Sequence, residues 1–329
     1  MQIAFLGDTL LGGEAETTLR RHGYPYAFRD VKELLVGADL VVANHEGPLT
    51  THAQPQEKAE TGRKRYWYRG RPDAAEALAE LGVRVVSLAN NHVLDFGLDG
   101  LNDTIAALDA AGIAHCGAGR DEDEARRPAI VTVGGRRFGF VSCMQRYEMY
   151  VRERLYASTS RAGCYRLRVS SVSDDLDRLL DVADVRIVLV HWGRNYRGVS
   201  ARQERLAAAF VDAGADLVIG HHPHIAQRVE LIHGVPVLYS LGNGLLGTPG
   251  RYHSGRPPYG LLAKVEFGAA TRAEEIDLQL LDIDNSRVEY SPSSACDESA
   301  REFLRSLVAP VGEWHETERG LRWSVGSSG

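Results

Sequence analysis

Short apolar runs recur along the chain, and their length and composition limit the folds that it can adopt. The runs are rich in Val, Ile and Leu, and each is too short to be a helix: QIAFLGD, DLVVANHE, VRVVSLANNH, RIVLVHWG, DLVIGHHPH and PVLYSLGN. Such nearly continuous apolar character is typical of strands that are buried on both faces of a sheet. The runs therefore predict an α/β protein with a buried sheet.

Amphipathic segments lie between several of these runs, and their pattern predicts helices. They are PDAAEALAELG, GLNDTIAALDAAG, SVSDDLDRLLDVAD and ARQERLAAAFVDAG. Gly82, Gly112 and Gly214 end three of them, at the position where a helix often stops in a left-handed glycine.

The sequence after Phe267 is more charged and less periodic than the sequence before it. We expect one domain over residues 1–267 and a peripheral extension over residues 268–329, with a late helix in DESAREFLRSLV. The closing VGSSG predicts a disordered tail.

Composition excludes several classes of protein. With 329 residues and a formal net charge of −6, the chain can bury a large core but lacks the basic surface that general nucleic-acid binding requires. The start, MQIAFLGD, has no basic region of a signal peptide, and no apolar stretch is long enough to cross a membrane. We expect a soluble, cytoplasmic protein that binds neither nucleic acid nor membrane, and nothing in the sequence indicates its oligomeric state.

Polar side chains end the apolar runs, and their chemical types point to a metal site. In chain order they are Asp8, Asn44, Glu46, Asn90, Asn91, His92, His191, His222, His224 and Asn243. Ligands of open α/β sheets bind beyond the carboxyl ends of the strands, so we expect these groups to meet at one edge. Carboxylate, amide and imidazole ligands without a thiolate suit a divalent ion. The alternative for each Asn or Asp is an ordinary turn former or helix cap.

The stretch VIGHHPHIAQ crowds His221, His222 and His224 around Pro223. A single histidine beside an apolar run is usually a core residue, but a His-x-His pair can aim two rings at one point. The three histidines together therefore favour a metal site, whereas a single histidine in this position would favour a core residue.

Two basic stretches could bind an anionic substrate. GRKRYWYRGRP contains Arg65, and GTPGRYHSGRPPYG contains Arg251 and Arg256. Arginine binds a carboxylate or a phosphate through two parallel hydrogen bonds, although a solvated basic surface is the alternative. The predicted substrate-binding residues are Asn44, Asn90, Arg65, Asn243, Arg251 and Arg256.

The motifs, taken in order, resemble one known family. GDTLLG, NHEGPLT, SLANNHVLDFG, VLVHWG, DAGADLVIGHHPH and YSLGN are similar to the motifs of the CapA family, the poly-γ-glutamate capsule synthesis proteins, over roughly residues 1–267. That family resembles a divergent branch of the calcineurin-like metallophosphoesterases. The resemblance implies a four-layer α/β/β/α sandwich, with helices outside two packed mixed sheets.

The resemblance also implies one or two divalent metal ions, which could be Mn, Fe or Zn. The implied ligands are Asp8, Glu46, Asn91, His191, His222 and His224, with Glu46 bridging two ions. The phosphoesterase motif Asp-x-His is broken here by Leu10, so we expect the ion on Asp8, Glu46 and His224 to be held more weakly than the second ion. Gly244 stands where the family usually has an aromatic residue, and we expect no membrane anchor of the kind that many members have.

A metal-dependent hydrolase is the leading functional hypothesis. In it, a metal-bound hydroxide attacks a phosphoester or a γ-glutamyl or peptide-like amide of a small anionic or glutamyl-containing substrate. The sequence contains neither Gly-x-Ser-x-Gly nor a Walker A loop, so a serine hydrolase and an ATP-driven ligase lack their own motifs. The alternatives are a non-hydrolytic component of poly-γ-glutamate or natural-product amide assembly, and a binding protein that uses the metal as a clamp.

His92 and Asp95 are the expected catalytic pair. Asp95 is expected to hydrogen-bond the His92 ring and favour the imidazolium, which would donate a proton to the leaving group. The alternative is that both residues cap the helix expected near Gly97.

Overall fold

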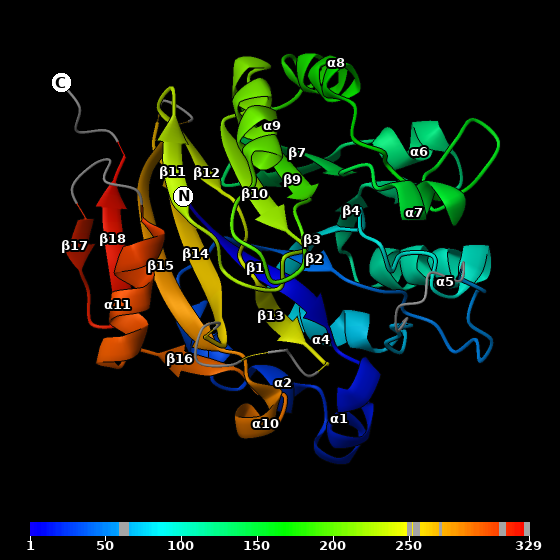
Figure 1. The fold of residues 1–329 in the computed structure, drawn as a ribbon, viewed down its shortest axis with the longest axis horizontal. Helices are drawn as coiled ribbons and strands as arrows, with labels where there is room; N and C mark the ends of the chain where they lie inside the picture. The colour runs from blue at the N-terminus through cyan, green and yellow to red at the C-terminus, as the bar shows by residue number, and fades with distance from the viewer. Residues whose placement is uncertain (59–65, 249–251, 253–256, 270–271, 309–313, 326–329) are drawn as a thin grey trace.

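Two large mixed sheets form the centre of the protein in a computed structural model, which describes residues 1–58, 66–248, 252, 257–269, 272–308 and 314–325 (Figure 1). The first sheet has the order β17 (Trp314–Glu316), β18 (Gly320–Ser324), β15 (Ala273–Asp282), β14 (Tyr259–Phe267), β1 (Gln2–Leu10), β2 (Leu40–His45), β3 (Val83–Ser87) and β4 (Ala114–Cys116). Two further strands pair with this sheet, β13 (Asn243–Leu246) with β1 and β16 (Ser293–Ala295) with β15.

The second sheet has six strands. Their order is β11 (Val229–Ile232), β12 (Val235–Leu238), β10 (Leu217–His221), β9 (Val185–His191), β7 (Arg136–Met144) and β6 (Ala129–Val133). A separate two-stranded sheet pairs β5 (Ala118–Gly119) with β8 (Gly163–Cys164). β1 to β4 run parallel to one another, as do β7, β9, β10 and β12, so within each sheet these strands deliver their carboxyl ends to one edge.

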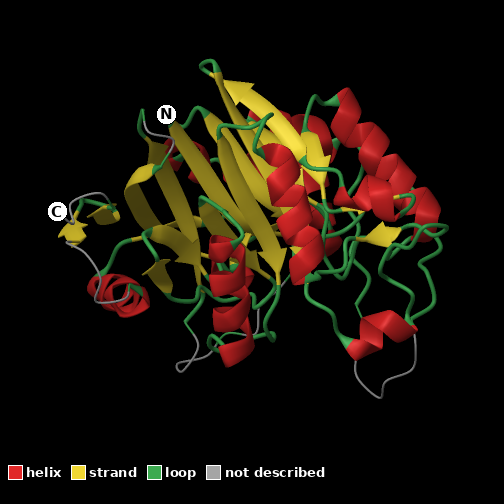
Figure 2. Ribbon diagram, turned by 90° about the horizontal axis from the view of Figure 1, so that it is seen from above, coloured by secondary structure: helices red, strands yellow, loops and turns green. Residues whose placement is uncertain are grey.

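Helices cover the outer face of each sheet (Figure 2). The helices on the first sheet are α1 (Glu16–His22), α2 (Pro25–Phe28), α3 (Val31–Leu34), α4 (Ala74–Glu80) and α5 (Gly97–Ala110), and η1 (Gly13–Ala15) precedes them. The helices on the second sheet are α6 (Glu122–Arg126), α8 (Val169–Leu179) and α9 (Ala201–Asp212). The remaining helices are α7 (Glu148–Arg152), α10 (Asn285–Val288) and α11 (Glu298–Leu307).

Three apolar clusters correspond to the three interfaces of a four-layer sandwich. Phe5 of β1 and Ile187 of β9 belong to the cluster between the two sheets. Leu6, on the other face of β1, packs with the helices of the first sheet, and Val188 packs with α8 and α9. Neighbouring residues of one strand thus face opposite layers, which is why these runs are apolar throughout. The predicted α/β/β/α architecture is confirmed.

The predicted helices are present as α4, α5, α8, α9 and α11. Gly82, Gly112 and Gly214 have φ angles of 95°, 69° and 90°, as expected for glycines that end helices. No helix of the described residues is long and apolar enough to span a membrane.

The expected domain boundary at residue 267 falls at the last residue of β14, just before the connection to β15. These two strands pair antiparallel from Tyr259 with Asp282 to Phe267 with Ala273. Beyond them, Trp323 of β18 is buried in the cluster between the sheets. The segment after residue 267 thus adds strands to the first sheet, whereas the expected tail, 326–329, lies outside the described residues.

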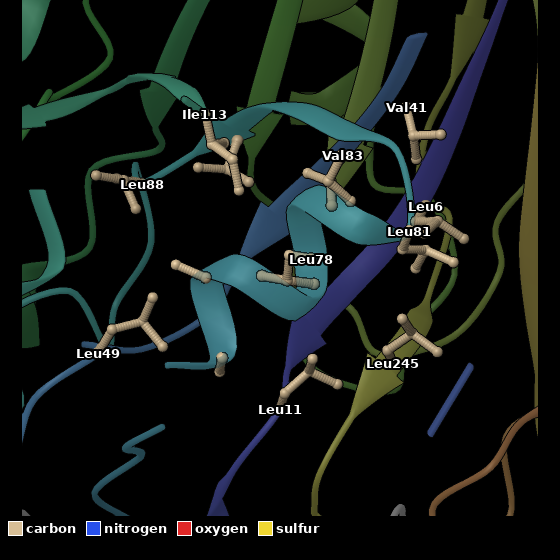
Figure 3. Packing of buried hydrophobic residues seen from close by; sticks show 14 of the residues in the cluster. Leu6, Leu11, Val41, Leu49, Leu78, Leu81, Val83, Leu88, Ile113 and Leu245 are labelled. Atoms are coloured by element: carbon tan, nitrogen blue, oxygen red, sulfur yellow. The ribbon is translucent and has the colours of Figure 1, made fainter. Parts of the chain in front are cut away.

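Substitutions in the outer cluster of the first sheet should destabilise the protein strongly. Leu78 of α4 is fully buried and belongs to the same cluster as Val83 and Leu81 (Figure 3). Leu78→Ala should lower the free energy of unfolding by about 2–5 kcal/mol, because the substitution leaves a cavity in a packed core. Leu98→Ala is the control, since Leu98 is 49% exposed and its replacement should change stability by roughly 0.5 kcal/mol or less. Urea denaturation of both variants checks the difference.

Candidate metal centre

Asp8 occupies the carboxyl end of β1, where the strand passes between two neighbours. It is in register with Asn44 of β2 on one side and with Asn243 of β13 on the other. Gly7 allows the backbone of β1 to lie close to Gly242, because a Cβ atom at position 7 would lie 2.0 Å from the Gly242 carbonyl oxygen. The Asp8 amide donates a hydrogen bond of 2.9 Å to that same oxygen.

The buried amide of Asn44 positions the carboxylates of Asp8 and Glu46. Asn44 Nδ2 lies 2.8 Å from Asp8 Oδ1 and 3.3 Å from Glu46 Oε2. Asn90, which follows β3, donates to the His45 carbonyl oxygen at 2.7 Å and lies 3.4 Å from Asn44 Oδ1. Asn44 and Asn90, which we predicted to bind substrate, are fully buried and use their amide groups within the protein. Asn44 orients the carboxylates, and Asn90 contacts Asn44 and the backbone of His45.

His224 completes a group of three potential metal ligands with Asp8 and Glu46. Its Nδ1 lies 3.1 Å from Asp8 Oδ2, and its Nε2 lies 3.8 Å from Glu46 Oε1. The ligand atoms of these residues all lie within 4.8 Å of one another, and no other such group of His, Cys, Asp or Glu occurs among the described residues. Asn243 Oδ1 lies 2.9 Å from His224 Nδ1, so a proton on Nδ1 leaves Nε2 free to bind a metal.

A second set of predicted ligands lies across the edge of the two sheets. His191 ends β9, and its Nε2 lies 2.8 Å from Oδ1 of Asn91, which follows β3. The His191 ring centroid is 4.5 Å from that of His222, and His222 is 6.2 Å from His224. In Figure 1 the ends of β9 and β10 lie beside β1 to β3, as these contacts require. The expected difference in metal affinity between the two sets stays a prediction.

The backbone of the His-Pro-His turn is strained. His222 has φ 98° and His224 has φ 57°, although residues with a Cβ atom rarely adopt positive φ. Such strain costs roughly 1–3 kcal/mol per residue and persists where the surrounding structure imposes it, commonly at functional sites. The strain is consistent with a turn that holds two rings toward one centre.

The pKa values of the Asp8 and Glu46 carboxylates are shifted in opposite directions, and a bound cation would stabilise both groups as anions. Burial raises the pKa of Asp8, but the imidazoles of His224, His221 and His191 outweigh it and bring the pKa below its usual range. Burial and the neighbouring Asp8 charge raise the pKa of Glu46 well above its usual value. Glu46 Oε1 is buried without a hydrogen-bond partner. An acidic, partly unpartnered cluster of this kind fits a divalent ion.

The histidines around the cluster are held in the neutral form that metal binding requires. Burial and the nearby His224 ring lower the pKa of His222 to about 3, and burial with the nearby His222 ring lowers that of His191 well below its usual value. Nδ1 of His191 and Nδ1 of His222 are buried without a hydrogen-bond partner. Together with the carboxylates, the donor set fits a metal ion bound by nitrogen and oxygen.

The structure shows the hydrogen bond expected between His92 and Asp95, with 2.7 Å between His92 Nδ1 and Asp95 Oδ2. The Tyr68 ring stacks on His92 at 3.9 Å, and the Tyr68 amide donates to Asp95 Oδ2 at 2.6 Å. We expected Asp95 to keep His92 as an imidazolium, but this was wrong, because the net shift of the His92 pKa is downward. Burial and the Lys58 charge outweigh Asp95 and lower the pKa of His92.

A family model described as a bacterial capsule synthesis protein, PGA_cap, matches residues 2–248. The chain belongs to this family. The CapA resemblance of the motifs is thereby confirmed, and curated relatives agree with it. The capsule biosynthesis protein CapA of Bacillus anthracis is 32% identical over 248 residues, which cover 74% of this chain and 59% of that protein. The PGA biosynthesis protein CapA of Bacillus subtilis is 27% identical over 250 residues, which cover 74% of this chain and 62% of that protein.

A probable polyglutamine synthesis accessory protein of Mycobacterium tuberculosis (strain H37Rv) is 36% identical over 286 residues, covering 83% of this chain and 72% of its own length. Among solved structures, a calcineurin-like phosphoesterase of Bacillus subtilis is similar with a TM-score of 0.48 and 14% identity, covering 93% of this chain and 96% of its own. The chain thus spans about three fifths of the length of the two CapA proteins.

Lys58 and Tyr252 lie beside the candidate ligands and were not predicted from the sequence, whereas His221 was expected beside the ligands and not among them. Lys58 Nζ lies 2.5 Å from Asp95 Oδ1, His221 Nδ1 lies 3.6 Å from Asp8 Oδ1, and the Tyr252 hydroxyl lies 2.8 Å from Asn243 Nδ2. Sequence spacing carries no signal for these contacts, because the partners come from different elements. The predicted Arg65, Arg251 and Arg256 lie outside the described residues, so their roles stay predictions.

Removing the Lys58 charge should destabilise the protein. Asp95 is 1% exposed, so Lys58→Met leaves a buried carboxylate without its cation and should lower the free energy of unfolding by roughly 3–5 kcal/mol. The double variant Lys58→Met/Asp95→Asn removes both charges and should recover part of this loss. Chemical denaturation measures all three proteins, and an equal loss in the single and double variants would contradict a buried ion pair.

Proposed function

We propose that this chain is a metal-dependent hydrolase that binds one or two divalent ions, such as Mn, Fe or Zn. One observation carries the proposal: Asp8, Glu46 and His224 place their ligand atoms within 4.8 Å of one another in a buried, acidic cluster. Asn91, His191 and His222 would bind a second ion beside it, since their donor atoms face the same edge of the two sheets.

A divalent ion held there supplies a Lewis acid that polarises the substrate and makes water a stronger nucleophile. The chain's own residues have separate tasks. Asn44 orients both carboxylates, and Asn243 orients the His224 ring. Neutral rings at His191 and His222 keep their lone pairs available as ligands.

His92 is the proposed proton carrier. With Nδ1 hydrogen-bonded to Asp95, its Nε2 is left to accept a proton, and burial keeps the resting ring neutral. The ring takes the proton that the attacking water loses and returns it to the departing oxygen or nitrogen. Tyr68, stacked on the ring, restricts its orientation.

The proposed substrate is a small anionic or glutamyl-containing molecule, cleaved at a phosphoester or at a γ-glutamyl or peptide-like amide. The metal cluster supports either bond. The names of the relatives, which refer to capsule, PGA and polyglutamine synthesis, favour the amide. The same names support the second candidate, a non-hydrolytic component of poly-γ-glutamate or related amide assembly.

A metal-loading and turnover experiment tests the proposal. The purified protein is reconstituted separately with Mn²⁺, Fe²⁺ and Zn²⁺, analysed for bound metal, and assayed on bis(p-nitrophenyl) phosphate and on γ-glutamyl p-nitroanilide. We expect at least one bound ion per chain and metal-dependent turnover of one substrate class. Bound metal without turnover of either class would favour the non-hydrolytic candidate. Metal content well below one ion per chain would contradict the metal centre itself.

A further inference from the structure

An arginine-rich segment lies beside the metal centre and has no task in the proposed chemistry. Segment 193–205, GRNYRGVSARQER, runs from the loop after β9 into the first turns of α9 and has four arginines and one glutamate, a formal charge of +3 in a chain of net charge −6. The glutamate, Glu204, pairs with Arg228 at 2.7 Å. Within the part of the chain that the structure describes, the exposed arginine side chains of the segment make no hydrogen bond or ion pair: Arg194, Arg197, Arg202 and Arg205.

This segment is packed directly on the histidines of the site. The Tyr147 hydroxyl donates a hydrogen bond of 2.5 Å to the Gly193 carbonyl oxygen, and the Tyr147 ring lies 5.6 Å from that of His222. The Tyr196 amide donates to the Pro223 carbonyl oxygen at 2.8 Å, and its ring lies 5.8 Å from that of His224. Gly193 and Tyr196, on either side of Arg194, are therefore fixed against the His-Pro-His turn.

The backbone of the segment is held in place while its cations face solvent. Gln227 Nε2 donates to the Arg197 carbonyl oxygen at 2.7 Å, and Gln203 Nε2 donates to Gln227 Oε1 at 2.9 Å. Burial and Tyr150 raise the pKa of Tyr147, whereas the charges of Arg202 and Arg194 lower it, so both cations lie near this tyrosine. The backbone positions beside these two arginines are also in contact, since a Cβ atom at Gly193 would lie 2.9 Å from Gln203 Nε2.

We propose that Arg194 and Arg202 bind an anionic group of the substrate that is not the group being cleaved. This inference rests on the proposed hydrolase function and specifies the substrate: it carries a carboxylate or a phosphate at some distance from the scissile bond. Arginine binds either anion through two parallel hydrogen bonds, and an anion between the two side chains removes their mutual repulsion.

Kinetics of the manganese-loaded protein on matched substrates test the site. Ethyl p-nitrophenyl phosphate is compared with its carboxymethyl and phosphonomethyl analogues, and γ-glutamyl p-nitroanilide is compared with its α-amide. In Arg194→Gln/Arg202→Gln, we expect KM for the compounds with the extra anion to rise roughly ten-fold or more, while their kcat is unchanged. The KM of the ethyl ester and of the α-amide, which lack that anion, should stay at the wild-type value. The analogue with the lower wild-type KM identifies the preferred anion.

The double variant Arg127→Gln/Arg319→Gln is the matched control, because it makes the same charge change at exposed positions on other elements. It should behave as wild type, and an equal rise in KM would show a long-range charge effect and overturn the site. An unchanged KM ratio in Arg194→Gln/Arg202→Gln would overturn it as well.

If the wild-type protein cleaves none of these compounds, the hydrolase proposal has failed, and calorimetric titration decides the arginine site by itself. Glutarate and glycerol 2-phosphate are the probes. Binding heat in the wild type that is lost in Arg194→Gln/Arg202→Gln supports the site. No heat in the wild type, or heat that the variant retains, overturns it.

Discussion

Asp8→Asn should abolish metal binding by the cluster of Asp8, Glu46 and His224 while leaving the fold intact. The substitution keeps the size of the side chain but removes one of the two carboxylate charges that face each other in a fully buried site. A divalent ion is held there chiefly by these charges, so the loss of affinity should exceed the roughly 10–100-fold that is typical when a residue behind a ligand is removed. Elemental analysis after reconstitution measures the occupancy.

Two further variants define how this result is interpreted. Asn243→Ala removes the acceptor for His224 Nδ1 but no ligand, and should weaken metal binding by roughly 10–100-fold. His221→Ala should matter less than Asp8→Asn, because His221 lies beside Asp8 and outside the proposed ligand set. Circular dichroism and urea denaturation establish that each variant is folded. Full metal occupancy in a folded Asp8→Asn protein would refute the proposed cluster.

His92→Ala should reduce turnover in a way that depends on the leaving group. A carrier that returns a proton to the departing atom matters most when that atom is a poor leaving group, and such catalysis is typically worth roughly 10²–10⁴-fold. We therefore expect losses of this order for alkyl phosphoesters or alkyl amides and a much smaller loss for the matching nitrophenyl compounds. Values of kcat/KM for both classes, measured with the same metal, give the comparison.

The metal content of His92→Ala should stay near the wild-type value, because the ring is hydrogen-bonded to Asp95 and is not assigned as a ligand. His233→Ala, at an exposed position, controls for the loss of a histidine as such and should change neither property. Equal losses on good and poor leaving groups, or loss of the metal, would assign His92 a structural or ligand role instead.

Much of the fold and of the candidate site could be predicted from the sequence, because the relevant signals are local. Strand and helix periodicity depends on neighbouring residues, and β1, β9 and α9 are found where that periodicity places them. The carboxyl ends of parallel strands share an edge, so Asp8, Glu46 and His191 could be assigned to one site before their distances were known.

The tertiary structure alone decided which of these groups touch and in what charge state. Lys58 reaches Asp95 across 37 positions of sequence, and Tyr147 reaches Gly193 across 46, through packing that no local pattern encodes. The His92 pKa shows the same limit. Sequence proximity to Asp95 suggested an imidazolium, but burial and Lys58 lower the pKa, because desolvation depends on everything packed around the ring and not on its neighbours in the chain.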